Sequence, residues 1–332
     1  MKIGVVGAGA IGGLVGARLA LAGEEVTLLD LPPVLEAIGR HGLRLREANG
    51  EERAARPAAL AASGTEAGAQ EVVFLAVKAH DLPEVARHLP AMTGRDTTFV
   101  TLQNGLPWWY FQRHGGPFDG RRIACLDPEG QLASAVAAER ILGCAAYPAA
   151  ESAAPGVIHH VEGDRFPLGE LDGSASERAE AVAALLARGG FRSRVLADIR
   201  AEVWLKAVGS AAFNPLSALT GLTLAELCAR PDTRARALAL MTEAQAVAAA
   251  LGVTLRVPLE KRLEGAAAVG HHKTSMLQDL EAGRPLELDA LVLAVVELGR
   301  LAGVETPELQ RTWAEVRATE RPASPPPVTP GV

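Results

Sequence analysis

Residues 2–13 read KIGVVGAGAIGG, and this stretch decides the fold of the first half of the chain. The run KIGVV (2–6) predicts a strand, and a helical pattern follows over 10–22. In the connection between strand and helix, one glycine permits a tight turn and a second lets a pyrophosphate approach the backbone. A third glycine lets the helix pack close to the strand. The stretch therefore predicts a dinucleotide-binding turn, and a glycine turn that binds no ligand is the alternative. The residues expected to contact the cofactor are Gly7, Ala8, Gly9, Ala10, Ile11 and Gly12.

Strand and helix patterns alternate after this unit, which predicts a parallel sheet with crossover helices. The next strands are expected at 24–30, 71–77 and 96–102, with helices at 33–40 and 81–89. Further on we expect hairpin-forming strands at 141–149, 156–164 and 165–170, a helix at 174–189 and a short strand at 191–196.

From about residue 198 the strand patterns end and Ala/Leu/Glu/Arg segments predict helices at 198–212, 231–251, 259–268, 286–303 and 306–319. The predicted class is α/β, with a Rossmann-type parallel-sheet domain over 1–197 and an all-α substrate or catalytic domain over 198–320. The Pro-rich residues 321–332 are expected to form a disordered or extended tail.

Composition restricts the class of protein. The 332 residues carry a formal net charge of −6, which argues against non-specific nucleic-acid binding. Three widely spaced cysteines without a CxxC pair suit a reducing cytoplasm. We expect neither a secretory signal nor a membrane span, because no sufficiently long apolar run exists.

Polar residues follow three of the predicted strands. Asp30 ends the second strand, where an acid can accept hydrogen bonds from ribose hydroxyls and repel a 2′-phosphate, so NADH is favoured over NADPH. A helix-capping role for Asp30 is the alternative. Lys78 and Asn104 follow the strands at 71–77 and 96–102, and the carboxyl ends of parallel strands are where such sheets bind ligands.

The stretch EVWLKAVGSAAFNP (202–215) predicts an interior helix with one polar stripe, because Glu202, Lys206, Ser210 and Asn214 recur every four residues. Burial would lower the pKa of Lys206 toward the range of a proton donor for a developing alkoxide. Pro215 predicts that the helix kinks or ends at Asn214. A lysine that only extends its charge to solvent is the alternative.

A second polar segment is HHKTSMLQDLEAGRPLELDAL (271–291). Here Ser275 and Asp279 lie four apart, and Glu287 opens an apolar helix, where a carboxylate could also serve as a cap. The adjacent histidine pairs at 159–160 and 271–272 do not have metal-site spacing, so no metal is expected.

Together these motifs resemble ketopantoate reductase (2-dehydropantoate 2-reductase) over roughly residues 1–320. The resemblance rests on GAGAIGG (7–13), VKAHD (77–81), LQNG (102–105), WLKAVGSAAFNPLSALTG (204–221) and TSMLQDLEAGRPLELDAL (274–291). It implies NAD(P)H-dependent reduction of 2-dehydropantoate to pantoate in pantothenate and coenzyme A biosynthesis. It also implies a Rossmann domain, a helical domain, a cleft site between them and a possible homodimer.

The resemblance implies a role for each matched residue. Lys206 matches the catalytic lysine that gives a proton to the 2-oxo group, and Glu287 matches the acid that binds the substrate hydroxyl and helps to hold that lysine. The residues matched to substrate orientation are Asn104, Asn214 and Ser275, and Lys78 matches a lysine near cofactor and substrate.

Two departures from the family pattern bear on specificity. Ser210 stands where many members have a second asparagine, so a different branched 2-oxo acid is the alternative substrate. Asp30 and Leu31 replace the basic residue that usually reads NADPH. The enlarged loop 107–122, with two tryptophans, could wall the cleft, form a separate hydrophobic cluster or make a dimer contact. A non-catalytic nucleotide sensor is the alternative from another class.

Overall fold

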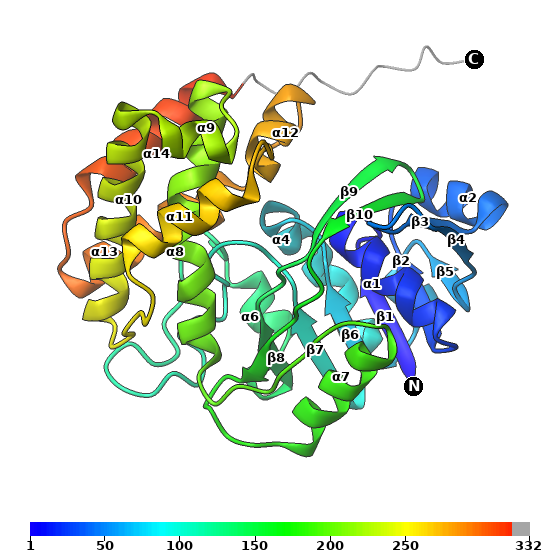
Figure 1. Cartoon of the computed structure of the whole chain (residues 1–332). Coiled ribbons are helices and arrows are strands. Elements are labelled where there is room, and N and C mark those ends of the chain that lie inside the picture. The colour runs from blue at the N-terminus through cyan, green and yellow to red at the C-terminus, as the bar shows by residue number, and fades with distance from the viewer. Residues whose placement is uncertain (321–332) are drawn as a thin grey trace, which may run out of the picture. The chain divides into compact units, whose positions relative to one another are not determined.

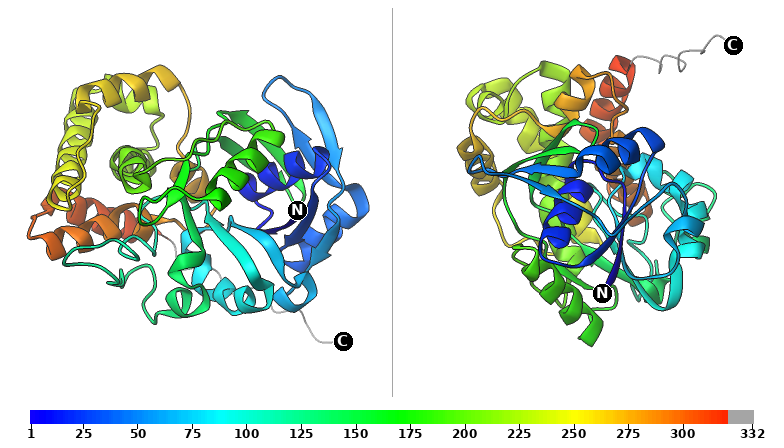
Figure 2. Two further views of the ribbon diagram at one scale, coloured as in Figure 1. Left: turned by 90° about the horizontal axis from the view of Figure 1, so that it is seen from below. Right: turned by 90° about the vertical axis from the view of Figure 1, so that its right-hand side faces the viewer.

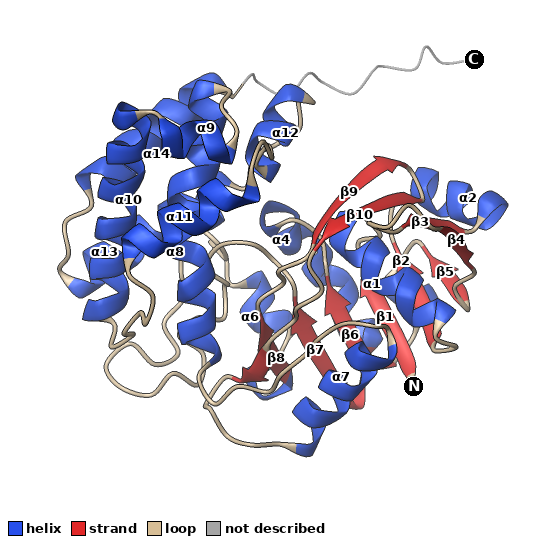
Figure 3. Cartoon of the chain, viewed as in Figure 1, coloured by secondary structure: helices blue, strands red, loops and turns tan. Residues whose placement is uncertain are grey.

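The computed structural model describes residues 1–320, so the predicted tail at 321–332 lies outside the described residues. Contacts divide the chain into two compact units, Met1–Val203 and a second that begins at Trp204. Strands and helices mix in the first unit, whereas the described part of the second contains helices and no strand (Figure 3). The predicted class of a Rossmann-type domain followed by an all-α domain is confirmed.

A seven-stranded sheet forms the centre of the first unit, in the order β11-β8-β7-β6-β1-β2-β5. All neighbouring strands are parallel except β11, which runs antiparallel to β8. The strands are β1 (Lys2–Val6), β2 (Glu25–Leu29), β5 (Ala59–Ala61), β6 (Gln70–Leu75), β7 (Thr93–Thr101), β8 (Ile141–Cys144) and β11 (Leu168–Glu170). The middle strands β1 and β6 are buried along most of their length, as expected for a sheet covered on both faces.

The helices of the first unit cover both faces of this sheet. Figure 2 shows α1 (Ala10–Leu21) and α7 (Glu177–Arg188) on one face and the short helices that precede β7 on the other. The remaining helices and 3₁₀ turns of this unit are α2 (Pro32–His41), α3 (Gly64–Ala67), η1 (Ala79–Asp81), α4 (Leu82–Val85), η2 (Ala86–His88), α5 (Leu89–Met92), α6 (Gln131–Ala135) and η3 (Ala138–Arg140).

A second, four-stranded sheet covers the outer side of α1, in the order β4-β3-β10-β9. Its strands are β3 (Leu43–Arg46), β4 (Glu52–Ala55), β9 (Ala149–Ala154) and β10 (Val157–Glu162). Glycines let α1 fit between the two sheets: a Cβ at Gly13 would lie 2.6 Å from Ile158, and one at Gly16 would lie 2.9 Å from Leu28. Because real Cβ atoms do not approach so closely, a side chain at either position would force Ile158 or Leu28 to shift within a closely packed layer.

The second unit consists of the helices labelled in Figure 1 as α8 to α14. Its first helix, α8 (Ile199–Thr220), begins in the first unit and runs unbroken across the boundary. The others are α9 (Leu224–Ala229), α10 (Pro231–Ala250), α11 (Leu259–Val269), α12 (Ser275–Glu281), the π-helical η4 (Asp289–Leu293), α13 (Ala294–Ala302) and α14 (Pro307–Thr319). Among the described residues, none of the helices combines the length and apolar character needed to cross a bilayer.

The structure refines three sequence predictions about these elements. The helical stretch expected at 81–89 lies within a continuous helical segment over 79–92, which alternates between 3₁₀ and α-helical turns, and Pro83 and Pro90 each lie near the start of an α-helical turn. The strand expected at 191–196 amounts to two isolated bridges, from Arg192 and Val195. The helix expected to end or kink at Asn214 does not end there and continues through Pro215 to Thr220. Strands β3, β4, β5 and β9 and helices α3, α6, α9 and α12 were not predicted.

Candidate functional site

The glycine turn has the geometry that a bound pyrophosphate needs. Gly7 has a φ of +92°, and a Cβ there would lie 2.9 Å from the backbone nitrogen of Val77. A Cβ on Gly12 would lie 1.9 Å from the carbonyl oxygen of Gly7, so only glycine lets the helix start this close to the strand. Nothing lies within 4 Å of a Cβ on Gly9. The second glycine of the motif therefore faces open space where a ligand can approach the backbone.

Helix α1 presents its N-terminus beside this open space. Gly9 caps the helix without a side-chain hydrogen bond, and no acidic residue occurs in the first turn. Ala10 and Ile11 are partly exposed there. Unpaired N–H groups and the positive end of the helix dipole favour an anion at this position, so the residues fit a dinucleotide phosphate.

Asp30 lies directly after β2 and is bound to the glycine turn. Its Oδ2 accepts a hydrogen bond of 2.5 Å from the backbone N–H of Ala8, and its Oδ1 accepts one of 2.6 Å from Leu31. Burial raises the pKa of Asp30, although these two backbone hydrogen bonds act in the opposite direction. Helix α2 has Leu31 as its N-cap and no side-chain cap, which argues against the capping alternative for Asp30.

Lys78 and Asn104 follow two neighbouring parallel strands of the same sheet, β6 and β7. Both residues are partly buried, and Gly105 after the asparagine has a φ of +78°. Gln103 was not predicted as part of the site, but its side-chain amide donates to the carbonyl oxygens of Leu75 and Val77, at 2.8 and 3.0 Å. It thus joins the segment that carries Lys78 to the segment that carries Asn104.

The loop after Asn104 is largely a hydrophobic cluster. Trp109, Tyr110 and Phe111 are fully buried, and the indole N–H of Trp109 donates to Thr101 Oγ1 at 2.8 Å. Arg200, in the first turn of α8, donates to the carbonyl oxygens of Tyr110 and Gln112, both at 2.7 Å. Of the three interpretations of the 107–122 loop, the structure favours a cluster within the first unit.

In the second unit, α8 carries Lys206, Ser210 and Asn214 at four-residue spacing, and all three are partly buried. The Asn214 amide donates to the Ser210 carbonyl at 3.2 Å, and its Oδ1 accepts from Ser275 Oγ at 3.3 Å. Ser275 opens α12, where Thr274 supplies the N-cap. The structure therefore brings Asn214 and Ser275 together, although they are 61 residues apart in the sequence.

Glu287 is half-buried and comes immediately before the helical turn that starts at Leu288. The loop before it is held by Asp279, which is 6% exposed and accepts a 2.8 Å hydrogen bond from Arg284 Nε. The helix that follows begins with the π-helical segment η4. Such segments are frequent at functional sites, since the wider turn re-aims side chains.

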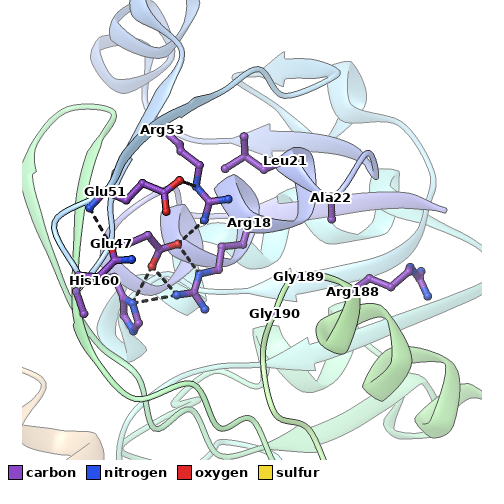
Figure 4. Close-up of a pocket in the computed structure, with 12 residues that line it drawn as sticks. Arg18, Leu21, Ala22, Glu47, Glu51, Arg53, His160, Arg188, Gly189 and Gly190 are labelled. Atoms are coloured by element: carbon purple, nitrogen blue, oxygen red, sulfur yellow. Dashed lines mark hydrogen bonds and ion pairs between the residues drawn. The ribbon is translucent and has the colours of Figure 1, made fainter.

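A cavity of about 550 Å³ lies elsewhere on the first unit, at the C-terminal end of α1 (Figure 4). Its lining contains none of the predicted site residues. Figure 4 shows instead a network in which Glu47 receives hydrogen bonds from two arginines and lies beside a histidine, the partners being Arg18, Arg53 and His160. Across residues 1–320, no group of three or more His, Cys, Asp or Glu side chains is placed to hold a metal ion.

Comparison with known proteins gives a consistent result over nearly the whole chain. The family model described as ketopantoate reductase PanE/ApbA matches residues 3–173, and the model of its C-terminal part matches residues 198–320. A 2-dehydropantoate 2-reductase of Mesorhizobium japonicum is 48% identical over 324 residues, covering 97% of this chain and 99% of its own.

Two solved structures are similar over 96% of this chain. A candidate ketopantoate reductase from Ralstonia solanacearum MolK2 has a TM-score of 0.91 and 39% identity, with 97% of its chain covered. A 2-dehydropantoate 2-reductase from Geobacter metallireducens GS-15 has a TM-score of 0.84 and 28% identity, with 99% of its chain covered.

Proposed function

The chain belongs to the ketopantoate reductase family of NAD(P)H-dependent oxidoreductases, and from this premise we propose that it reduces 2-dehydropantoate to pantoate. The observation that carries the proposal is the polar stripe of α8. There Lys206, Ser210 and Asn214 share a helix face, and Asn214 is hydrogen-bonded to Ser275. A proton donor and hydrogen-bonding groups on one helix are what the reduction of a carbonyl requires besides the hydride.

The cofactor is assigned to the carboxyl edge of the first sheet, and residues 1–197 are proposed as the cofactor domain. When bound, NAD(P)H supplies the hydride that adds to C2 of the substrate. The proposed contacts come from the glycine turn, from Asp30 and from the strand ends that carry Lys78 and Asn104. This assignment is supported by the open space beside Gly9 and by the uncapped N-terminus of α1.

We propose a preference for NADH over NADPH. The carboxylate of Asp30 is held on both oxygens by backbone N–H groups, so it cannot easily turn away from a ribose at this edge. A 2′-phosphate there would meet a negative charge. The nearby Arg40 is 71% exposed and paired with Glu36 at 3.2 Å, so it is an unsuitable phosphate partner in this arrangement.

Residues 198–320 are proposed as the catalytic domain. Lys206 is the proton donor to the oxygen that becomes an alkoxide as hydride adds to C2. Glu287 binds the substrate hydroxyl and helps to hold the lysine. Asn104, Asn214 and Ser275 orient the substrate and its carboxylate, a role supported for the last two by their mutual hydrogen bond.

A second candidate substrate is a different branched 2-oxo acid, and Ser210 favours it. Serine at this place in the stripe has a shorter reach than the asparagine of many family members. A larger or differently shaped substituent could occupy the space that remains. If the enzyme reduces 2-dehydropantoate and the serine is only a tolerated change, Ser210→Asn should raise kcat/KM for 2-dehydropantoate. If the serine fits another 2-oxo acid, Ser210→Asn should lower the activity on that other acid.

We also propose a cytoplasmic homodimer. Cys125, Cys144 and Cys228 are not joined in disulfide bonds, which is compatible with a reducing compartment, and the dimer is suggested by the family resemblance. Sedimentation equilibrium at micromolar concentration tests the dimer, and a single species at the mass of one chain would contradict it.

Steady-state oxidation of NADH and NADPH across a panel of 2-oxo acids tests the substrate and the cofactor together. We expect turnover of 2-dehydropantoate, with a higher kcat/KM for NADH. No turnover with either cofactor would eliminate this substrate. In an Asp30→Arg variant the preference should move toward NADPH, and an unchanged preference would contradict the role given to Asp30.

The role of Lys206 is tested by Lys206→Ala, with Lys261→Ala as the matched control. Lys261 is 70% exposed on α11 and pairs with Glu264. Loss of a general acid typically costs about 10²–10⁴-fold in rate, so kcat should fall by that order while the Kd for NADH changes little. Near-normal turnover of Lys206→Ala would remove the lysine from the mechanism.

A further inference from the structure

Two residues of opposite charge contact or occupy positions that neighbour Lys206 on α8, and the family resemblance assigns a role to neither. The first is Glu202, four residues earlier on α8. Residues four apart on a helix are surface neighbours, and long helical side chains lean toward the N-terminus. Because α8 is unbroken from Ile199 to Thr220, helix geometry alone directs the Lys206 side chain over the turn that carries Glu202.

The carboxylate of Glu202 is held in place from the other side. Tyr147 donates its hydroxyl to Glu202 Oε1 at 2.7 Å. The guanidinium of Arg165 in turn lies over the Tyr147 ring, 4.2 Å from its centroid. A carboxylate that is already ordered loses less conformational freedom when it pairs with an ammonium group, so its effect on the lysine is larger.

The second charged side chain is Arg262 on α11. Its Nη2 donates to the carbonyl oxygen of Leu205, the residue immediately before Lys206. A Cβ on Gly209 would lie 3.1 Å from the same nitrogen, so the missing side chain at 209 makes room for the guanidinium on the helix surface. Position 209 is three residues after Lys206 and therefore adjacent to it on the helix. A guanidinium stays charged at every working pH.

Other charged groups near this stretch are the same in every variant proposed below. Asp198 Oδ1 accepts from the Ala201 N–H at 2.9 Å and caps the first turn of α8. Arg200 is directed at backbone carbonyls, as described above. Glu287 is the further acid that the family resemblance assigns to Lys206. A difference in the protonation midpoint of Lys206 between variants can therefore be attributed to the change at Glu202 or Arg262.

Resting on the proposed role of Lys206 as proton donor, we propose that Glu202 and Arg262 are positioning residues that act on the proton of Lys206 in opposite directions. Attraction by Glu202 holds the amine in its ammonium form and orients it. Repulsion by Arg262 makes the proton easier to release when the alkoxide oxygen develops. Lys206 gives one proton to that oxygen in each turnover and regains one from water, so protons balance.

The test follows the titration of Lys206 itself, without turnover. The full-length chain is treated with an amine-reactive reagent across a range of pH, and labelling of the peptide that contains Lys206 is measured by mass spectrometry. Glu202→Gln keeps an acceptor for Tyr147 and should lower the midpoint by about one pH unit. Arg262→Met should raise it by about half a unit to one unit, because the repulsion is removed.

Three comparisons separate this effect from general damage. Arg262→Lys keeps the charge and should retain a midpoint close to that of the wild type. Glu260→Gln removes an exposed charge from the first turn of the same helix α11 and should leave the midpoint unchanged. Circular dichroism checks the fold of each variant, and Arg262→Gln replaces Arg262→Met if the methionine variant does not fold.

The pH dependence of kcat gives a second readout. The basic limb should move to lower pH in Glu202→Gln, with up to about a tenfold loss of rate above the new midpoint. Labelling midpoints that stay unchanged, or that move in the same direction in Glu202→Gln and Arg262→Met, would overturn the inference. Failure of the proposed function is distinguishable, since it would appear as near-normal turnover in Lys206→Ala whatever the labelling midpoints are.

Discussion

Replacing Glu47 by Gln should destabilise the first unit by an amount that depends strongly on pH. Glu47 connects the β3–β4 hairpin to α1 and β10 (Figure 4). Its side chain is 9% exposed and pairs with Arg18 at 2.5 Å, with Arg53 at 3.0 Å and with His160 at 3.0 Å. Glutamine has nearly the same shape but carries no charge, so the variant isolates the electrostatic part of this network.

The magnitude follows from the pKa of Glu47. Burial alone would raise this pKa, but hydrogen bonds and charge attraction from Arg18, and then from His160, outweigh burial and lower it from 4.5 to about 2. Each pKa unit between the folded and unfolded states corresponds to about 1.4 kcal/mol, so the ionised form contributes about 3 kcal/mol to stability at pH 7.

Because the folded pKa lies below the unfolded one, this contribution is complete above about pH 5 and is lost as the pH falls toward 2. At pH 3 about 1.4 kcal/mol remains. The free-energy difference between the wild type and Glu47→Gln should therefore shrink by about half between pH 7 and pH 3.

Urea denaturation followed by circular dichroism measures this difference, and hydrogen exchange of α1 and β3 amides assigns it to the first unit. A chain of two units need not unfold in a single step, so the exchange data are needed for that assignment. Glu51→Gln is the matched control: this side chain is 56% exposed, and its pair with Arg53 should contribute less than about 0.5 kcal/mol. A loss in Glu47→Gln that is equal at pH 7 and pH 3, or matched by Glu51→Gln, would refute the reasoning.

Two further predictions concern the nucleotide turn and the cluster behind Asn104. Gly12→Ala should lower both stability and NADH affinity, because its Cβ would overlap the Gly7 carbonyl. Gly9→Ala places its Cβ in open space with a φ of −71°, so it should weaken NADH binding at unchanged stability. Thermal melting and NADH titration measure both effects, and equal melting temperatures for the two variants would contradict the argument. Trp109→Phe should lower the free energy of unfolding, measured by urea denaturation, by about 1–3 kcal/mol, since it removes the hydrogen bond to Thr101 and leaves a small cavity. A loss below about 0.5 kcal/mol would mean that neither the hydrogen bond nor the cavity matters for stability.

The nucleotide half of the fold was largely predictable because its signals are local. A β-branched run, a glycine turn, a helix and a second strand within residues 2–30 already define a βαβ unit, and β1, α1 and β2 occur where the sequence places them. The second sheet was missed in part, although LRLR at β3 alternates between buried and exposed side chains as a strand with one covered face should. Four residues carry too little pattern to distinguish a strand from a loop.

Pro215 shows how tertiary context overrides a local rule. A proline disfavours helical geometry at the residue before it, yet α8 continues for five more residues. The side chain of Asn214 donates to the Ser210 carbonyl within this turn, and both Leu216 and Ala218 beyond the proline are buried. Burial of these side chains outweighs the local preference. The same continuation keeps Asn214 on the stripe of Lys206 and Ser210.

By itself, the sequence determined the fold class, the turn that suits a dinucleotide and the helical stripe of Lys206, Ser210 and Asn214. Each of these depends on patterns among residues that are close together in the sequence. Only the tertiary structure decided which distant groups meet: Asn214 with Ser275, Glu202 with Tyr147, and Arg262 with the backbone beside Lys206. These contacts join segments 55 to 61 residues apart. Such pairings follow from how helices and strands pack, and no spacing along the chain encodes them.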